Sequence, residues 1–221
     1  QSHLQLPAGS EHCLIPSFPA GMPLPNAIAF IQKNYKIIPT VELKYCEEDL
    51  LSTCILVDLV EEGILLKFEP RTQTLLMIEV YDLMKLTMRY SNVAFSGPDI
   101  NPTFVLIYTR FGPSFPGDYD KESRMYNLYY PVPFPLLYNS QRSLSVQNLQ
   151  GLSFSFRIPE EHEIFDETEL PLEFPDGTTP TTTSMTLYHG PRHAPTVPAM
   201  PKDYFEEVHV LVSKCIYFTR R

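Results

Sequence analysis

Hydrophobic and polar residues alternate along much of the first half of this chain. The stretch EEGILLKFEPRTQTLLMIEVYDL, residues 61–83, holds two apolar runs around a polar turn and predicts a β-hairpin. Val41, Leu43 and Tyr45 alternate with polar residues in TVELKYC, and similar runs follow in TCILVDLV and KLTMRY. Because these runs are joined by short connections, we predict an antiparallel meander; parallel neighbours would need long crossovers.

A helical period precedes these strands, in GMPLPNAIAFIQKNYKIIP. The apolar residues that recur at helical spacing are Leu24, Ala27, Ile28, Ile31 and Tyr35. Pro23 and Pro25 suit a first turn, where a missing N–H costs nothing, and Pro39 ends the segment. The spacing predicts an amphipathic helix over residues 23–36 that lies on the sheet.

The second half of the chain mixes strand, helix and loop patterns. Residues 102–112, PTFVLIYTRFG, predict a second short helix between a proline and a glycine. The aromatic and proline-rich YNLYYPVPFPLLYN favours an edge strand or a surface loop. GLSFSFRI predicts a strand whose start echoes GILLKF, which hints at reuse of one structural unit. MTLYH and VHVLVSKCIYF predict the last strands.

Together these patterns predict an α+β fold, in which an antiparallel sheet packs against the N-terminal helix and a few further strands follow towards the C-terminus. The predicted organisation is a loose lead-in over 1–20, a core domain over 21–158, an acidic and threonine-rich linker over 159–183, and C-terminal strands over 184–221. The last strands either complete the same domain or start a second layer.

Composition narrows the classes of function. A net charge of −9 disfavours a nucleic-acid binder, since the field of the whole protein repels polyanions. The four cysteines form no CxxC pair, which favours reduced thiols and a cytoplasmic protein. The longest apolar runs are too short to span a bilayer. The 22 prolines are about twice the usual share and predict stiff loops.

The search for reactive groups finds no catalytic residue, cofactor site or metal site. Seven carboxylates crowd residues 160–173 without the glycine-bent loop of a calcium site, so we interpret them as a solvated acidic loop. GDYDKES lacks the glycine and late glutamate of an EF-hand and indicates a surface turn. His189 and His193 are separated by a glycine and a proline, which makes a helical zinc site implausible. Ser114 in GPSFPG does not match a nucleophile elbow.

One binding motif remains. In RHAPTVP, Arg192, Pro195 and Pro198 have the spacing of a polyproline II ligand with a basic anchor. The alternative is an ordinary proline-rich loop. Thr179, before Pro180, is the phosphorylation site that composition favours among the hydroxyls of residues 178–184.

Several stretches, taken in their order and spacing, resemble the N-terminal half of the phagosome assembly factor family. They are GMPLPNAIAFIQ, EEGILLKFEPRTQTLLMIEVYDLMKLTMRY, FGPSFPGDY, GLSFSFRI and, more faintly, PDGTT followed by MTLYHG. The resemblance implies a further half with a related helix-and-hairpin layout in family members, and we expect it to be missing from this chain. The insert YPVPFPLLYNSQRSLSVQNLQ also lengthens the approach to Gly151.

The resemblance implies a cytosolic, non-enzymatic protein that works with a WD-repeat β-propeller partner at phosphoinositide-marked phagophore membranes in autophagy. It implies no set of catalytic or lipid-binding residues, and an acidic chain is compatible with membrane contact made through the partner.

Two hypotheses for function follow. In the first, the chain is a scaffold or adaptor, and Tyr129, Tyr130 and Phe134 form an exposed aromatic partner site. In the second, it is a carrier that binds a lipid or small apolar ligand between helix and sheet, because the Phe, Leu and Ile on alternating strands can line a cavity as well as fill a core.

Overall fold

Antiparallel strands dominate the fold. The computed structural model describes residues 18–46, 51–90, 93–131, 151–162, 170–188, 207–212 and 215–217. Within them lies a ten-stranded sheet in the order β12-β11-β1-β2-β3-β4-β10-β9-β8-β7, with every neighbouring pair antiparallel. The predicted α+β fold, with an antiparallel sheet against an N-terminal helix, is confirmed.

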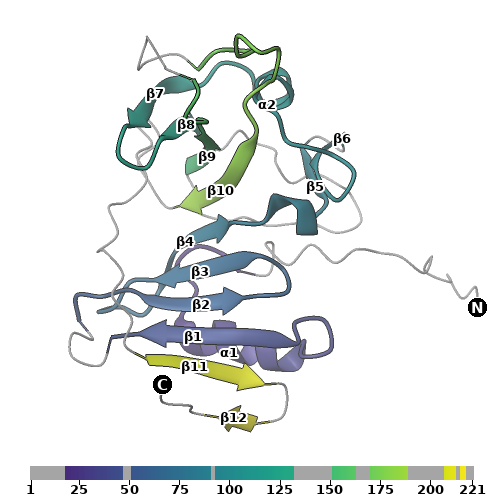
Figure 1. The fold of residues 1–221 in the computed structure, drawn as a ribbon. Helices are drawn as coiled ribbons and strands as arrows, with labels where there is room; N and C mark the ends of the chain where they lie inside the picture. The colour runs from purple at the N-terminus through teal and green to yellow at the C-terminus, as the bar shows by residue number, and fades with distance from the viewer. Residues whose placement is uncertain are drawn as a thin grey trace, which may run out of the picture.

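The elements follow one another in this order: α1 (Leu24–Lys33), β1 (Thr40–Tyr45), β2 (Ile55–Leu59), β3 (Ile64–Phe68), β4 (Leu75–Val80), the 3-10 turn η2 (Leu83–Lys85), β5 (Met88–Tyr90), β6 (Val93–Ser96), α2 (Phe104–Phe111), β7 (Phe115–Asp120), β8 (Met125–Pro131), β9 (Gly151–Arg157), β10 (Thr182–Tyr188), β11 (Glu207–Val212) and β12 (Cys215–Tyr217). Figure 1 shows β1–β4 with α1 in the lower part of the molecule and β7–β10 with α2 in the upper part.

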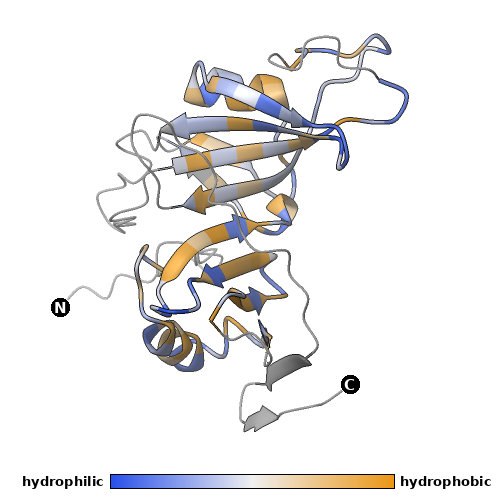
Figure 2. Ribbon diagram, turned by 90° about the vertical axis from the view of Figure 1, so that its left-hand side faces the viewer, coloured by the Kyte–Doolittle hydropathy of each residue, from blue (hydrophilic) through white to orange (hydrophobic). Residues whose placement is uncertain are grey.

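The two helices cover the apolar face of the sheet, which we call the inner face. Ala27 and Ile31 of α1 are buried with Val57 of β2 in one core cluster. The ring of Phe111 in α2 lies tilted against that of Phe154 in β9, with ring centroids 5.1 Å apart. Figure 2 shows the alternation as bands of apolar and polar residues along the strands. Each fully buried Leu, Ile or Phe contributes about 1.5–3 kcal/mol, so this continuous apolar face is the main source of stability.

The sheet is built from two copies of one pattern, a helix followed by a four-stranded meander. The first copy is α1 with β1–β4, the second is α2 with β7–β10, and the two meanders join where β4 pairs with β10. GILLKF and GLSFSF, whose similarity suggested reuse, form the third strand of the first and second meander respectively.

The hydrogen bonds at the two helix starts are also equivalent. Leu24 N donates to Gln73 O and Leu75 N donates to Met22 O, at 2.8 and 2.9 Å. In the second copy, Phe104 N donates to Pro180 O and Thr182 N donates to Pro102 O, at the same two distances. In both, the residue before the helix forms a bridge with the residue before the fourth strand, Pro23 with Thr74 and Thr103 with Thr181. The fold therefore contains an internal repeat.

Three predictions about individual strands need correction or completion. KLTMRY does not extend the meander: Asp82 caps η2 through Met84 N, the chain leaves the sheet, and β5 pairs only with β6. YNLYYP is not an edge strand, because β8 lies between β7 and β9; Pro131 is its last residue, where a missing N–H is tolerated. The backbone of β11 pairs with β1, so the C-terminal strands complete the first sheet.

The ends of the predicted lead-in and linker are packed against the body where the structure describes them. Phe18 is buried and meets Phe30 edge-on at 5.1 Å. His162 is buried and stacks on Phe174 at 4.3 Å. Arg124 donates to the carbonyls of Ile158, Pro159 and His162, which fastens the start of the linker to the β7–β8 turn. The part of the acidic stretch beyond His162, up to residue 169, lies outside the described residues.

Gly63 and Gly21 provide a matched test of close packing at the β2–β3 turn. Both have positive φ, +67° and +76°. A Cβ on Gly63 would lie 2.6 Å from Cβ of Asp82, while one on Gly21 would meet no described residue within 4 Å. We expect Gly21→Ala to cost about 1 kcal/mol for backbone strain alone. Gly63→Ala should cost about 2–4 kcal/mol in urea unfolding, because overpacking adds to the strain. Equal losses in the two variants would contradict the contact with Asp82.

Candidate interaction surface

The face of the sheet opposite the helices, here called the outer face, carries the polar residues. Cross-strand register places two rows on it in the first meander: Glu42, Asp58, Leu65 and Glu79 in one, and Lys44, Leu56, Lys67 and Met77 in the other. Strand residues alternate between faces, so a chain that buries Val57 and Leu59 inside must present Asp58 outside. Both described helices pack on the inner face, but Leu56, Asp58 and Met77 of the outer face are also buried.

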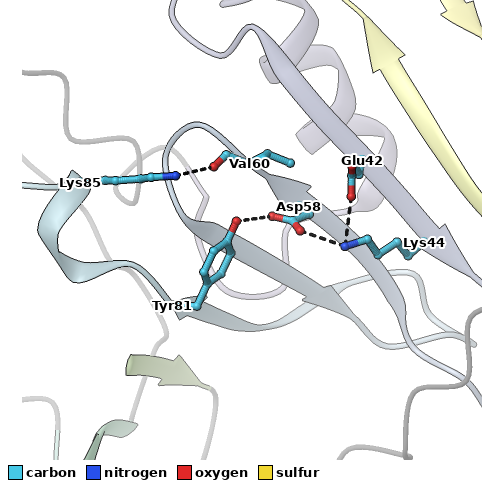
Figure 3. Close-up of polar contacts among 6 residues, drawn as sticks. All are labelled: Glu42, Lys44, Asp58, Val60, Tyr81 and Lys85. Carbon is cyan, nitrogen blue, oxygen red and sulfur yellow. Dashed lines mark hydrogen bonds and ion pairs between the residues drawn. The ribbon is translucent and has the colours of Figure 1, made fainter. Parts of the chain in front are cut away.

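Asp58 is the centre of a polar cluster on the outer face (Figure 3). The residue is only 8% exposed, and its carboxylate accepts two hydrogen bonds, from Lys44 Nζ and from Tyr81 Oη, each at 3.0 Å. Lys44 Nζ also lies 3.2 Å from Glu42 Oε2. A separate pair joins Lys67 Nζ to Glu79 Oε2 at 2.9 Å. These contacts tie β1, β2, β3 and β4 together across the surface.

The surroundings of Lys44 and Tyr81 raise the pKa of both groups. Burial by itself would lower the pKa of Lys44, but hydrogen bonds to Asp58 and Glu42 outweigh it and raise that pKa. Burial, together with the hydrogen bond to Asp58, raises the pKa of Tyr81. Lys44 therefore stays charged and Tyr81 stays neutral, so the cluster fixes strand geometry and is not arranged to transfer protons at neutral pH.

In the second meander, small polar residues and two tyrosines, Tyr129 and Tyr188, continue the outer face. Ser155 Oγ donates to Asn127 Oδ1 at 2.8 Å, and Tyr129 shares a row with Ser153 and Thr186. Tyr129 is half-buried, and burial together with a hydrogen bond to Asp118 raises its pKa. The predicted partner residue Tyr129 thus lies on the outer face, where its row neighbours Ser153 and Thr186 are buried.

Tyr130 does not lie on the surface. It is 2% exposed and packs beside Phe111 and Phe154 in the inner core, with ring centroids 5.7 and 5.9 Å away. The expectation that both tyrosines are exposed was wrong because successive residues of a strand point to opposite faces. Only one of the pair can lie on the outer face.

The remaining predicted interaction residues, Phe134, Arg192, Pro195 and Pro198, lie outside the described residues. The strand ends that precede them are close, however. Pro131 of β8 and Tyr188 of β10 are both opposite Gly151 of β9, so β8 and β10, two strands apart, end at the same end of the sheet. This places the two strand ends about 10 Å from each other.

The described residues offer little else for chemistry. None of their His, Cys, Asp and Glu side chains form a group of three or more that could hold a metal ion. Asp120 caps the β7–β8 turn through Glu122 N and Ser123 Oγ, as a surface turn requires. The Thr179 hydroxyl is buried, so the predicted phosphorylation site is shielded in the folded chain. Within the described ranges, no helix is long and apolar enough to cross a membrane.

The Asp58 cluster was missed at the sequence level, although a signal was present. Asp58 interrupts the apolar run CILVDLV, and a charged residue in a buried strand requires a partner. Lys44 and Tyr81 are distant in sequence, and only the pairing of β1 with β2 and the end of β4 brings them together.

A double-mutant cycle can measure the strength of the Asp58–Lys44 pair. We expect Asp58→Ala and Lys44→Met to show a coupling free energy of about 1–3 kcal/mol in urea unfolding, because the carboxylate is buried. The matched control is Asp82 with Lys85, which are exposed and 3.8 Å apart. Their cycle should give less than about 0.5 kcal/mol. Equal coupling in the two cycles would contradict the claim that burial strengthens the Asp58–Lys44 pair.

Tyr188 and Tyr129 allow a second comparison, of an unpaired and a paired hydroxyl. The buried Tyr188 hydroxyl has no hydrogen-bond partner among the described residues, so Tyr188→Phe should leave stability at pH 7 unchanged or raise it by up to about 1 kcal/mol. Tyr129→Phe should lower it by about 0.5–1.5 kcal/mol, since a hydrogen bond is lost. Loss of stability in both variants would count against an unpaired Tyr188.

The same tyrosine predicts a dependence on alkaline pH. Burial raises the pKa of Tyr188 from 10.0 to about 12. The neutral ring therefore favours the folded state fully below pH 10, and this contribution is lost as the pH rises towards 12. In unfolding titrations over this window, wild type should lose more stability than Tyr188→Phe; parallel curves would contradict the shift.

Comparisons with known proteins give one consistent result. The family model described as phagosome assembly factor 1 matches residues 15–133 and 132–219. A PHAF1 protein of Arabidopsis thaliana is 37% identical over 91% of this chain and 48% of its own length. A Drosophila melanogaster PHAF1 protein is 28% identical over 97% of this chain and 45% of its own. A Caenorhabditis elegans PHAF1 protein is 30% identical over 79% of this chain and 38% of its own length.

No solved structure matches the chain. The chain spans about half the length of the Arabidopsis and Drosophila relatives it matches, while the family model covers most of the residues described here. On this similarity, the chain belongs to the phagosome assembly factor 1 family.

Proposed function

We propose that this protein is a non-enzymatic scaffold or adaptor that acts with a WD-repeat β-propeller partner at phagophore membranes in autophagy. The observation that carries the proposal is membership of the phagosome assembly factor 1 family. The architecture supports it: the charged groups that the outer face carries in the first meander are paired with one another, which suits a structural surface better than catalysis.

The charge of the chain supports an indirect route to the membrane. With a net charge of −9, the chain is repelled by anionic lipid surfaces, so the partner would supply the contact with phosphoinositides. In this proposal the protein is cytoplasmic and reaches the phagophore through the propeller. The outer face around Tyr129 is the surface we assign to the partner, because it combines a half-buried aromatic ring with polar neighbours.

The alternative of a lipid or small-molecule carrier stays a prediction, as does docking of Arg192, Pro195 and Pro198 into an SH3-type groove. The inner-face side chains between helix and sheet, such as Ala27, Val57 and Leu66, are fully buried in one cluster, and no observation favours a ligand there.

Affinity purification tests the partnership. The tagged chain, expressed in fed and starved cells and followed by quantitative mass spectrometry, should recover a WD-repeat propeller protein, and the propeller should recover the chain in return. Tyr129→Arg should lower the recovery at least fivefold. Tyr108→Arg is the matched control, because Tyr108 is 45% exposed on α2, on the helical side of the sheet, and should leave recovery unchanged.

Two results would contradict the proposal. Repeated absence of any propeller from reciprocal purifications would remove the partner. Equal recovery with Tyr129→Arg and Tyr108→Arg would remove the outer face as its binding surface.

A further inference from the structure

The outer edge of β7 is the end of the sheet on the side of the second meander. No described strand pairs with it, and Figure 1 shows β7 at the margin of the upper part of the molecule. An edge strand presents a row of backbone N–H and C=O groups that can pair with another chain. The question is what kind of segment this edge would accept.

The internal repeat supplies a precedent. β7 occupies the place in the second meander that β1 occupies in the first. The outer edge of β1 is taken by the antiparallel strand β11, over the six residue pairs from Thr40↔Val212 to Tyr45↔Glu207. The architecture therefore already includes an extended segment added to a meander at this position. At the equivalent position in the second meander, no described strand pairs with the outer edge of β7.

The side chains of β7 define the chemistry of the edge. Asp118 and Asp120 are exposed and two residues apart, so both carboxylates lie on the same face of the sheet. Tyr119, between them, points to the other face and packs against the core. A strand laid against β7 would face two negative charges at alternate positions and an apolar side chain between them. Opposite charges across a strand pair stabilise it and like charges destabilise it.

These features argue against a second copy of the chain as the occupant. Antiparallel pairing of two β7 strands would bring two pairs of carboxylates together. Pro116 removes one backbone donor, and a register shift between Phe115 and Asp118 interrupts the strand, two devices that protect edges from self-association. Because these two features lie at the start of β7, residues 117–120 remain available to a partner of complementary charge.

We propose that the outer edge of β7 is a docking site for an extended segment of a partner protein, which adds as an antiparallel strand and carries Lys or Arg at two alternate positions with an apolar residue between them. This is strand addition, in which backbone hydrogen bonds supply affinity and alternate side chains supply specificity. The strand-addition proposal goes beyond the proposed partnership with a propeller, because it requires only an extended segment and does not depend on a folded propeller domain.

A synthetic peptide tests the site directly. The probe is the capped peptide TTVKVKVTT, titrated to millimolar concentration into the isotope-labelled 221-residue chain at low salt. The expected result is slower amide exchange and altered amide shifts in residues 115–120, with binding about tenfold tighter than that of the charge-reversed TTVEVEVTT. A third peptide, TTPKVKPTT, keeps the lysines but cannot form a strand, and it should bind more weakly than the first.

Charge-reversed variants separate a specific edge from general attraction to an acidic protein. Asp118→Lys with Asp120→Lys should weaken TTVKVKVTT about tenfold and reverse the preference between the two charged peptides. The matched control, Glu61→Lys with Asp99→Lys, makes the same charge change at two exposed turn residues and should alter affinity less than twofold.

The proposal is overturned by any of four outcomes: no binding of TTVKVKVTT at millimolar concentration, equal binding of the lysine and glutamate peptides, equal losses in the two double variants, or protection outside β7. Protection of residues 115–120 that grows with protein concentration in the absence of peptide, together with a dimer in light scattering, would assign the edge to a second copy and equally overturn it. Amide exchange of the unmodified chain is independent of any folding defect in the variants.

Discussion

The structure depends on the antiparallel pairing of β4 with β10. Four residue pairs, from Met185↔Val80 to Tyr188↔Met77, join two meanders that are otherwise separate along the chain. Because all strands of the sheet keep one alternation of faces through this junction, the apolar residues of both meanders fall on the same side. That shared side is where α1 and α2 lie, and it makes one core out of two similar units.

The internal repeat explains why the two halves of the sheet look alike, although their outer edges differ. Each copy anchors the start of its helix to its fourth strand through the same pair of backbone hydrogen bonds. The outer edges differ: the first copy receives β11, whereas β7 carries a proline, a register shift and two exposed carboxylates. The first meander is thus extended by a strand of the same chain, whereas the outer edge of the second is protected against pairing with another copy of β7.

Function in this family member is proposed to reside on the outside of the sheet. The buried carboxylate of Asp58 is already satisfied by Lys44 and Tyr81, so it stabilises the surface without providing a free reactive group. A rigid face of this type can bind a partner without paying much ordering entropy. Tyr129 on the outer face and Asp118 on the neighbouring edge strand are joined by a hydrogen bond, so the two proposed surfaces adjoin.

Local patterns alone determined a large part of this protein. The period of Leu24, Ala27 and Ile31 predicted α1, and the alternation in residues 61–83 predicted β3 and β4, because such periods report which side of an element meets apolar surroundings. The predictions that failed concern contacts between residues distant in sequence. That β8 is internal, that Tyr130 is buried, and that Asp58 meets Lys44 all follow from strand order and register, which depend on contacts between residues distant in sequence. Tertiary structure decided these because a strand's own residues do not encode its neighbours.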